Sequence, residues 1–285
     1  MKDITASIVL YNTPISEITL TLTTLKGAKR LKHIYIIDNS TSPILDKSDY
    51  EDDFTTYIFN SKNIGYGRAH NIAIRKALKE KNSYHVVLNT DIEFSSQVIN
   101  ELGEYMDQNI EVGQIMPKIV NIDGSNQYLC KLIPSPLDLF ARRFLPKSIF
   151  KQKRKLFTLE NANYNSVMNI PNLSGCFMFL RASTLNDIGI FDERFLLYAE
   201  DVDLTRRIHS KYKTIYYPKA TVTHYAKHES YTNYKVMIIH ISSLVKYFNK
   251  WGWFNDEQKD DINTVTLNNY TSINNNSIVP TPTEQ

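Results

Sequence analysis

The sequence predicts an α/β fold in which a mostly parallel sheet carries helices on both faces. Strand-like and helix-like segments alternate through the first 120 residues, which is the order that repeated strand–helix–strand units produce. Residues 85–88 have the β-branched, apolar character of an inner strand covered on both sides. Three predicted strands end on polar residues, at 11–12, 38–40 and 89–91. Because ligands bind beyond the carboxyl ends of parallel strands, these residues are expected to line one crevice.

The order of the elements follows from apolar periodicity. In chain order they are strand 6–11, helix 13–26, strands 33–38 and 56–60, helix 67–81, strand 84–88, helix 95–108 and strand 112–120. Residues 123–166 mix basic and apolar residues without a clean period, and ordered segments resume at 170–181, 191–211 and 214–225. A later helix, 235–254, presents one apolar face made of Met237, Ile238, Ile241, Leu244, Val245 and Phe248.

The composition indicates a globular protein, with 42% hydrophobic and 22% charged residues. The net charge of +3 is too small to indicate binding to nucleic acid, so no such partner is expected. Cys130 and Cys176 lie far apart without a metal-binding spacing, which favours reduced packing residues. No signal-peptide pattern opens the chain, and no apolar run approaches the roughly 20 residues of a membrane span. We therefore expect a cytoplasmic protein.

Asp91 follows the predicted inner strand, after Asn89 and Thr90. One interpretation is a polar turn that caps the next helix, since Asn and Asp favour such turns. The other is a metal site, because a carboxylate beside a second oxygen donor can hold Mg²⁺ or Mn²⁺ while substrate phosphates complete the coordination. This segment alone leaves both interpretations open.

The stretch "NIGYGRAHN", residues 63–71, places two glycines just before a helix. Glycine permits close approach of the backbone, and a helix N-terminus favours an anion. The stretch is not the dinucleotide-binding motif G-x-G-x-x-G, because His70 occupies the third glycine position, and it lacks the lysine of a P-loop. A nicotinamide cofactor is disfavoured, and an ordinary loop remains the alternative.

The segment "YAEDVDLTRRIHS" crowds three acids at an apparent helix start. Complementing the helix dipole explains one or two of them. A carboxylate held there could also take a proton from a hydroxyl, and the spacing does not decide between Glu200 and Asp201. His224 ends another strand; a surface histidine is the alternative unless it joins Asp91 in the crevice.

Together these segments resemble the inverting glycosyltransferases of family 2, in their rhamnosyltransferase-like branch, over about residues 6–225. "SIVLYN" and "IIDNS" are similar to the first two strands of that family, "NIGYGRAHNIAI" to its Asn-Gly segment, and "LNTDIEF" occupies its D-x-D position. "SGCFMFLR" resembles the strand near the donor sugar, and "FDERFLLYAEDVDLTRR" is close to the segment F-D-E-x-F-F-x-Y-x-E-D-x-D-L. The resemblance implies the GT-A fold, an α/β fold with a mostly parallel, Rossmann-like sheet, here with a C-terminal helical extension.

The resemblance also implies roles for individual residues. Asp201 would be the catalytic base, and Asp91 would bind Mg²⁺ or Mn²⁺ with His224 at the metal or the diphosphate. The residues implied to bind the transferred sugar or the acceptor are Glu200, Gly175, Cys176 and Tyr198. Those implied to bind the nucleotide are Tyr11, Asn12, Asp38, Asn63, Gly65, Arg68 and Asn89. Two departures stand out: Asn89 replaces the first acid of D-x-D, and "AKHES" replaces the glycines that usually follow the histidine.

The implied reaction moves a sugar from a nucleotide-diphospho-sugar, a UDP-hexose or dTDP-rhamnose, to a hydroxyl of a saccharide acceptor. We expect a lipid-linked acceptor in bacterial surface polysaccharide assembly. The basic and apolar residues of 142–155 suit an anionic membrane surface, as does the helix that ends in Lys246, Lys250, Trp251 and Trp253. This favours peripheral contact with the inner face of the plasma membrane. The alternative is a helix packed on the catalytic domain.

We therefore expect a catalytic domain over 1–230, an amphipathic helical region over 231–265 and a disordered tail over 266–285. Within the domain, residues 1–120 form the nucleotide-binding half, 123–166 a mobile basic excursion, and 167–230 the acceptor-binding and catalytic half. Two other functions compete with sugar transfer. A nucleotidyltransferase of the same fold would need a glycine- and lysine-rich first loop, which "YNTPISE" does not supply. A catalytically silent carbohydrate-binding protein would not need Asp91 and Asp201 together.

Overall fold

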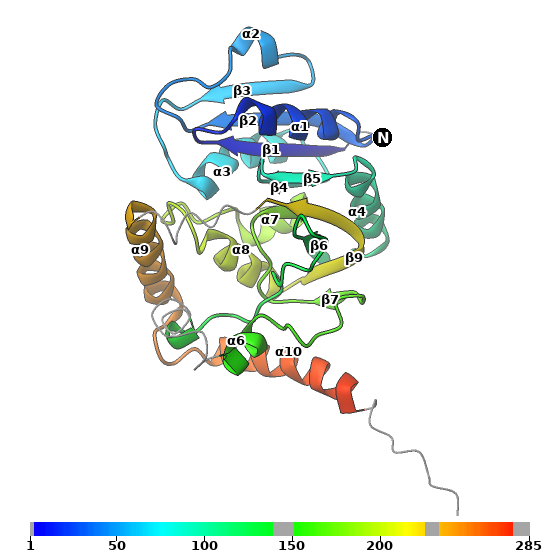
Figure 1. Ribbon diagram of the computed structural model, residues 1–285, viewed down its shortest axis with the longest axis vertical. Helices are drawn as coiled ribbons and strands as arrows, with labels where there is room; N and C mark the ends of the chain where they lie inside the picture. Colours follow the sequence, from blue (N-terminus) through cyan, green and yellow to red (C-terminus); the bar gives the residue numbers. More distant parts are fainter. Residues whose placement is uncertain (1–2, 139–150, 226–233, 276–285) are drawn as a thin grey trace, which may run out of the picture.

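A single sheet organises the part of the chain that the computed structural model describes, residues 3–138, 151–225 and 234–275 (Figure 1). Nine strands of these residues join the sheet in the order β3-β2-β1-β4-β8-β6-β9-β5, with β7 paired to β9. Their bounds are β1 Ile4–Leu10, β2 Leu31–Asp38, β3 Thr55–Phe59, β4 Tyr84–Leu88, β5 Ile92–Phe94, β6 Val112–Val120, β7 Met168–Asn169, β8 Phe177–Arg181 and β9 Lys213–His224.

The sheet is mostly parallel. Strands β3, β2, β1 and β4 pair in parallel, and β8 runs antiparallel between β4 and β6. Strand β6 therefore points the same way as β4, and β9 pairs with β6 in parallel. The short strands β5 and β7 run antiparallel to β9. The carboxyl ends of β1, β2, β4 and β9 consequently lie at the same edge, as predicted for a mostly parallel sheet.

Helices cover both faces of the sheet. Successive side chains of each inner strand point to opposite sides, so both faces carry apolar side chains that the helices bury. Val86 and Leu88 of β4 enter the large core with the apolar faces of α1 (Ile15–Lys26) and α4 (Gln97–Gln108). Val87 enters the opposite core, with α3 (Tyr66–Lys79), α7 (Ala182–Ile188) and α8 (Glu200–His209). The predicted α/β fold is thus confirmed.

The remaining helices are the short α2 (Lys47–Tyr50) and α6 (Lys151–Phe157), and the C-terminal pair α9 (Tyr234–Trp251) and α10 (Glu257–Asn275). In Figure 1, α9 stands beside the domain and α10 crosses below it. No helix in the described ranges is long and apolar enough to cross a bilayer.

Some sequence expectations are corrected. The tail expected from 266 is helical as far as Asn275, because Thr266 is buried and Leu267 packs against the large core. On α9, Ile238, Ile241 and Val245 of the apolar face are exposed. Phe248 of the same face is buried with Tyr247 in a small separate cluster.

The basic excursion at 123–166 is only partly described. Residues 139–150, where mobility was expected, lie outside the described residues. On the C-terminal side, Phe157, Leu159 and Tyr164 are buried in the large core, which ties this part of the excursion to the domain. The expected nucleotide-binding and catalytic halves share one sheet, since β4 pairs with β8 across the boundary between them.

Candidate active site

Asp91 and His224 meet at the sheet edge because of the pairing between β5 and β9. Ile92 is opposite His224 in this antiparallel pair, and the Tyr225 amide donates to the Asp91 carbonyl at 2.8 Å. The Asp91 carboxylate lies 3.5 Å from His224 Nε2, and both side chains are largely buried. The helix predicted to begin at about 95 begins at Gln97, and the intervening strand β5 had not been predicted.

Gln127 fixes the orientation of the His224 ring. Its Nε2 donates to the His224 carbonyl at 2.8 Å, so its Oε1, 2.9 Å from His224 Nδ1, accepts a hydrogen bond from that N–H group. In the neutral imidazole, Nε2 then presents its lone pair to the Asp91 carboxylate. Two electron-pair donors facing each other at this distance are stabilised by a cation between them.

This donor set therefore fits a divalent metal ion. Burial raises the pKa of the Asp91 carboxyl, but the hydrogen bond and positive charge of a protonated His224, with the Asn89 contact, lower this pKa on balance. A metal cation would take the place of the His224 proton. Within the described residues, no three His, Cys, Asp or Glu side chains are grouped to hold a metal. A metal site with few protein ligands is the arrangement in which substrate phosphates supply the others.

Asp201 lies at the start of α8 and contacts the loop before β8. Its Oδ2 accepts the Gly175 amide at 2.9 Å, and its Oδ1 accepts the Val202 amide at 2.9 Å. A Cβ at position 175 would lie 3.1 Å from the Asp201 Cβ, so glycine permits this close approach. Cys176 is buried, and burial is the main cause that raises the pKa of its thiol to about 12, with the nearby Asp91 and Asp201 adding to it. A buried neutral thiol is a packing group and not a nucleophile.

Glu200 differs from its neighbour. It is buried, and burial followed by the charge of Asp201 raises the pKa of its carboxyl group to about 8. Its Oε2 has no hydrogen-bond partner among the described residues. Two adjacent carboxyl groups in environments this different are typical of a site where one carries a proton and the other a charge.

Tyr66 joins the two halves of the site, and the sequence had not indicated it. Its hydroxyl lies 3.0 Å from Asn89 Oδ1 and 2.9 Å from the Gly175 carbonyl. The Asn89 amide in turn donates to the Cys176 carbonyl at 3.0 Å. Tyr66 and Asn89 thus connect the loop of Asp91 to the loop of Gly175, whose amide binds Asp201 at the start of α8. The signal available in the sequence was the aromatic residue between the glycines of 63–71.

The glycine stretch forms the start of α3. The Gly65 amide donates to Asn63 Oδ1 at 2.9 Å, which tightens the turn. Gly65 has a φ of 101°, and a Cβ there would come within 2.7 Å of the Leu196 carbonyl oxygen. The Tyr66 amide donates to that oxygen at 2.9 Å, so the stretch is bound to the loop before α8. Arg68 is half-exposed and forms an ion pair with Glu193.

The ends of β1 and β2 supply a separate part of the site. Asp38 is buried, and its carboxylate accepts the Ser40 and Ile44 amides at 2.9 Å and the Tyr57 hydroxyl at 2.6 Å. It therefore shapes the loop after β2, and its predicted contact with a nucleotide stays a prediction. Tyr11 and Asn12 are exposed at the end of β1.

Residues 5–189 match the family model described as Glycosyl transferase family 2. The chain belongs to this family. The match ends before α8, so the segment that carries Glu200 and Asp201 lies beyond it.

Two curated relatives resemble this family 2 chain. The low-salt glycan biosynthesis hexosyltransferase Agl10 of Haloferax volcanii is 26% identical over 209 residues, which cover 70% of this chain and 63% of the relative. The N-acetylglucosaminyl-diphospho-decaprenol L-rhamnosyltransferase of Mycobacterium tuberculosis is 26% identical over 181 residues, which cover 59% of this chain and 58% of the relative. The chain spans about three fifths of the length of these relatives.

Solved structures of GT-A glycosyltransferases share the fold. GalNAc-T7 with UDP, GalNAc and Mn²⁺ superposes with a TM-score of 0.59 at 16% identity, over 78% of this chain and 42% of that one. Residues 1–349 of Staphylococcus aureus TarS with UDP give 0.55 at 17% identity, over 95% and 72%. The mannosyltransferase PcManGT from Pyrobaculum calidifontis with GDP-Man and Mn²⁺ gives 0.56 at 13% identity, over 95% and 75%. The predicted GT-A fold is confirmed.

Proposed function

We propose that this chain transfers a sugar from a nucleotide-diphospho-sugar to a hydroxyl of a saccharide acceptor, with inversion at the anomeric carbon. The observation that carries the proposal is the contact between Asp201 Oδ2 and the Gly175 amide, in a site that Tyr66 connects to Asp91. It supports two carboxylates acting in one pocket, one toward the acceptor and one toward the diphosphate. Both carboxylates are needed for sugar transfer, whereas a carbohydrate-binding protein would need neither.

Asp201 is the base in this mechanism. Its Oδ1 and Oδ2 each accept one backbone amide, which orients the carboxylate and still leaves lone pairs for an acceptor hydroxyl. The acceptor oxygen bonds to the anomeric carbon as the bond to the diphosphate breaks, and its proton passes to Asp201. One displacement inverts the configuration. Glu200 stays protonated beside Asp201 at neutral pH and can donate a hydrogen bond to a substrate oxygen.

Asp91 and His224 would hold Mg²⁺ or Mn²⁺ on the diphosphate side. When bound, such an ion offsets the charge that develops on the departing diphosphate. Asn89 is held by Tyr66 and contributes an amide in place of the acid that usually opens D-x-D. We assign Tyr11, Asn12, Asp38 and the stretch 63–68 to the nucleotide side, and Gly175, Cys176 and Tyr198 to the sugar side.

The donor we propose is a UDP-hexose or dTDP-rhamnose, and the acceptor a lipid-linked saccharide in bacterial surface polysaccharide assembly. The hexosyltransferase and decaprenol-linked rhamnosyltransferase relatives support these classes. Thermal-shift measurements against a set of nucleotide sugars with Mn²⁺ identify the donor, because a ligand that binds the native state raises the melting temperature.

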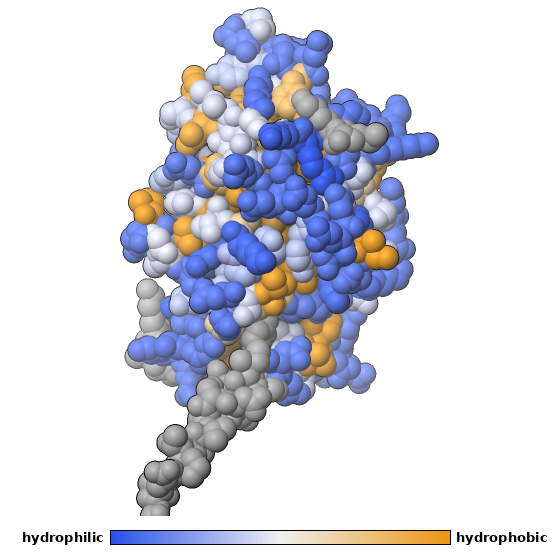
Figure 2. All heavy atoms as spheres, turned by 90° about the vertical axis from the view of Figure 1, so that its right-hand side faces the viewer, coloured by the Kyte–Doolittle hydropathy of each residue, from blue (hydrophilic) through white to orange (hydrophobic). Residues whose placement is uncertain are grey.

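Peripheral membrane contact is a further part of the proposal, but it cannot use the basic end of α9. Lys246 donates to the Arg194 carbonyl, and Lys250 and Trp251 both bind Asp203. The exposed apolar residues near that end include Val245, Trp253 and Phe254. The face seen in Figure 2 is dominated by hydrophilic residues with scattered apolar ones, so it offers no alternative. Failure to sediment with anionic vesicles at moderate salt would remove this part.

The variant Asp201→Asn tests the base. Asn can still accept the Gly175 amide through its side-chain oxygen, so the fold is expected to survive while the proton acceptor is lost. We expect transfer to fall at least 100-fold, with nucleotide binding unchanged. Asp187→Asn, which changes an exposed acid paired with Lys211, is the matched control and should keep full activity. Full transfer by Asp201→Asn would remove this assignment.

A further inference from the structure

Helix α9 packs directly on the segment that delivers Glu200 and Asp201. Phe195 and Ala199 form a cluster with Tyr247 and Phe248 of α9, separate from the sheet cores. The Ser243 hydroxyl donates to the Leu197 carbonyl at 2.8 Å. All of these contacts involve residues beyond the family match, which ends at 189.

The two residues just before α8 have a backbone conformation that neighbouring contacts must stabilise. Tyr198 and Ala199 have φ values of 68° and 69°, the left-handed region that side chains disfavour. Backbone in this region persists where the surrounding structure holds it. Here the holding contacts come from α9: the His240 ring lies 4.4 Å from the Tyr198 ring, and Lys246 binds the Arg194 carbonyl at 2.8 Å.

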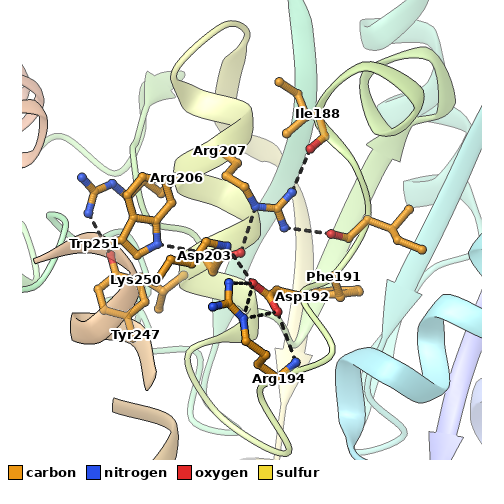
Figure 3. Close-up of polar contacts among 12 residues, drawn as sticks. Ile188, Phe191, Asp192, Arg194, Asp203, Arg206, Arg207, Tyr247, Lys250 and Trp251 are labelled. Carbon is orange, nitrogen blue, oxygen red and sulfur yellow. Dashed lines mark hydrogen bonds and ion pairs between the residues drawn. The ribbon is translucent and has the colours of Figure 1, made fainter. Parts of the chain in front are cut away.

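Asp203, in the first turn of α8, is the centre of the polar contacts to α9 (Figure 3). Its side chain is fully buried, and its amide donates to the Ala199 carbonyl at 2.9 Å. One carboxylate oxygen accepts Trp251 Nε1 at 2.8 Å and Lys250 Nζ at 2.6 Å. The other accepts Arg207 Nε at 2.9 Å. Each of these three side chains donates a hydrogen bond to the Asp203 carboxylate, so both of its oxygens are hydrogen-bonded within the protein.

Arg206 of α8 contacts the ring face of the same tryptophan, Trp251. It is 1% exposed, and its Cζ lies 3.9 Å from the centre of the Trp251 ring. Its two terminal nitrogens bind the carboxylate of Asp256, at 2.7 and 2.5 Å, just before α10. The indole thus contacts two charged residues of α8, one through its N–H and one through its ring face.

We propose that Asp203 is a positioning residue for the reaction, and that α9 acts through it to hold Asp201 against Gly175. The inference rests on the proposed function, in which Asp201 is the base. Among the described residues, the Asp203 carboxylate bonds to Arg207 of α8 and to Lys250 and Trp251 of α9, and its side chain is fully buried, so it acts without touching substrate. It acts by fixing the first turn of α8, where a displacement of about 1 Å can lower turnover 100-fold.

Asp203→Asn tests this role, with Trp251→Phe as a graded variant that keeps a ring beside Arg206 but removes the N–H donor. Asp3→Asn is the control, because it breaks a partly buried ion pair with Arg30, outside α8 and α9. Each variant is compared with the parent at the same interval below its own melting temperature. The first readout is hydrogen exchange at the Gly175 and Tyr66 amides, which bond to Asp201 and Leu196.

We expect Asp203→Asn to accelerate exchange at both amides at least tenfold, Trp251→Phe less, and Asp3→Asn not at all. Where turnover is measured, kcat should fall about 10- to 100-fold with the donor KM unchanged. Exchange at Gly175 that is unaltered in Asp203→Asn would overturn the proposal, whatever the activity. A failure of the proposed function would appear differently, as full transfer by Asp201→Asn.

Discussion

The protonated state of Glu200 makes a quantitative prediction about stability. The pKa of its carboxyl group is about 8 in the folded chain, compared with 4.5 for an ordinary glutamate. The lower value applies when the chain unfolds. Between these values the folded protein binds a proton that the unfolded chain has released. The contribution of Glu200 to the free energy of unfolding is therefore fully present below pH 4.5 and is lost as pH rises toward 8. Each pH unit costs about 1.4 kcal/mol, so the whole interval is worth about 5 kcal/mol.

Glu200→Gln removes the proton while keeping the shape of the neutral side chain. The free energy of unfolding of the variant relative to the parent should therefore rise with pH, by about 5 kcal/mol between pH 4.5 and pH 8. Urea unfolding at several pH values measures this difference, in which the titrating groups that do not interact with Glu200 cancel. Glu104→Gln, at an exposed position, is the control and should show no such trend. A pH-independent difference for Glu200→Gln would refute the assignment of a protonated carboxyl group.

Three further predictions concern the groups around the site. Tyr66→Phe removes the hydroxyl that joins Asn89 to Gly175; we expect stability to fall by about 1 kcal/mol and transfer by about tenfold, measured by unfolding and by turnover. Gln127→Leu frees the His224 ring, so Mn²⁺-dependent nucleotide binding should weaken about 10- to 100-fold, while metal-free binding measured by calorimetry stays the same. His85 is buried, and burial lowers its pKa from 6.5 to about 3. As pH falls, the unfolded chain takes up a proton before the folded protein does, so the free energy of unfolding should fall by about 1.4 kcal/mol per pH unit between pH 6.5 and 3. His85→Gln should reduce this slope in acid unfolding curves.

Much of the fold could be predicted because its signals are local. The apolar periodicity of α1 and the continuous apolar run of β4 each identify an element without reference to the rest of the chain. Strand β5 was missed because three residues between a turn and a helix carry too little pattern. Helix α10 beyond 265 was missed because its composition resembles a disordered segment, and its packing of Leu267 depends on a distant core.

The candidate site shows the same division. Asp91 could be singled out because an acid at the end of a buried strand is conspicuous in a sequence. Asp201 was separated from Glu200 only by the resemblance to the family, because three acids crowd the start of that helix. Tyr66 and Gln127 were missed: the only signal for Tyr66 was its position between two glycines, and an amide such as Gln127 in a loop has no local mark of function. Their importance comes from contacts with residues more than twenty positions away, which only the fold creates.

The pairing of Ile92 with His224 has a consequence for how the chain becomes competent. A shift by one residue would turn every side chain of the short strand to the other face, so the partner of Asp91 is chosen by sheet register. That register can be set only once the last strand has taken its place. Asp91 and His224 therefore come together only after the long chain between them, which contains β6, β8 and α8, has been made.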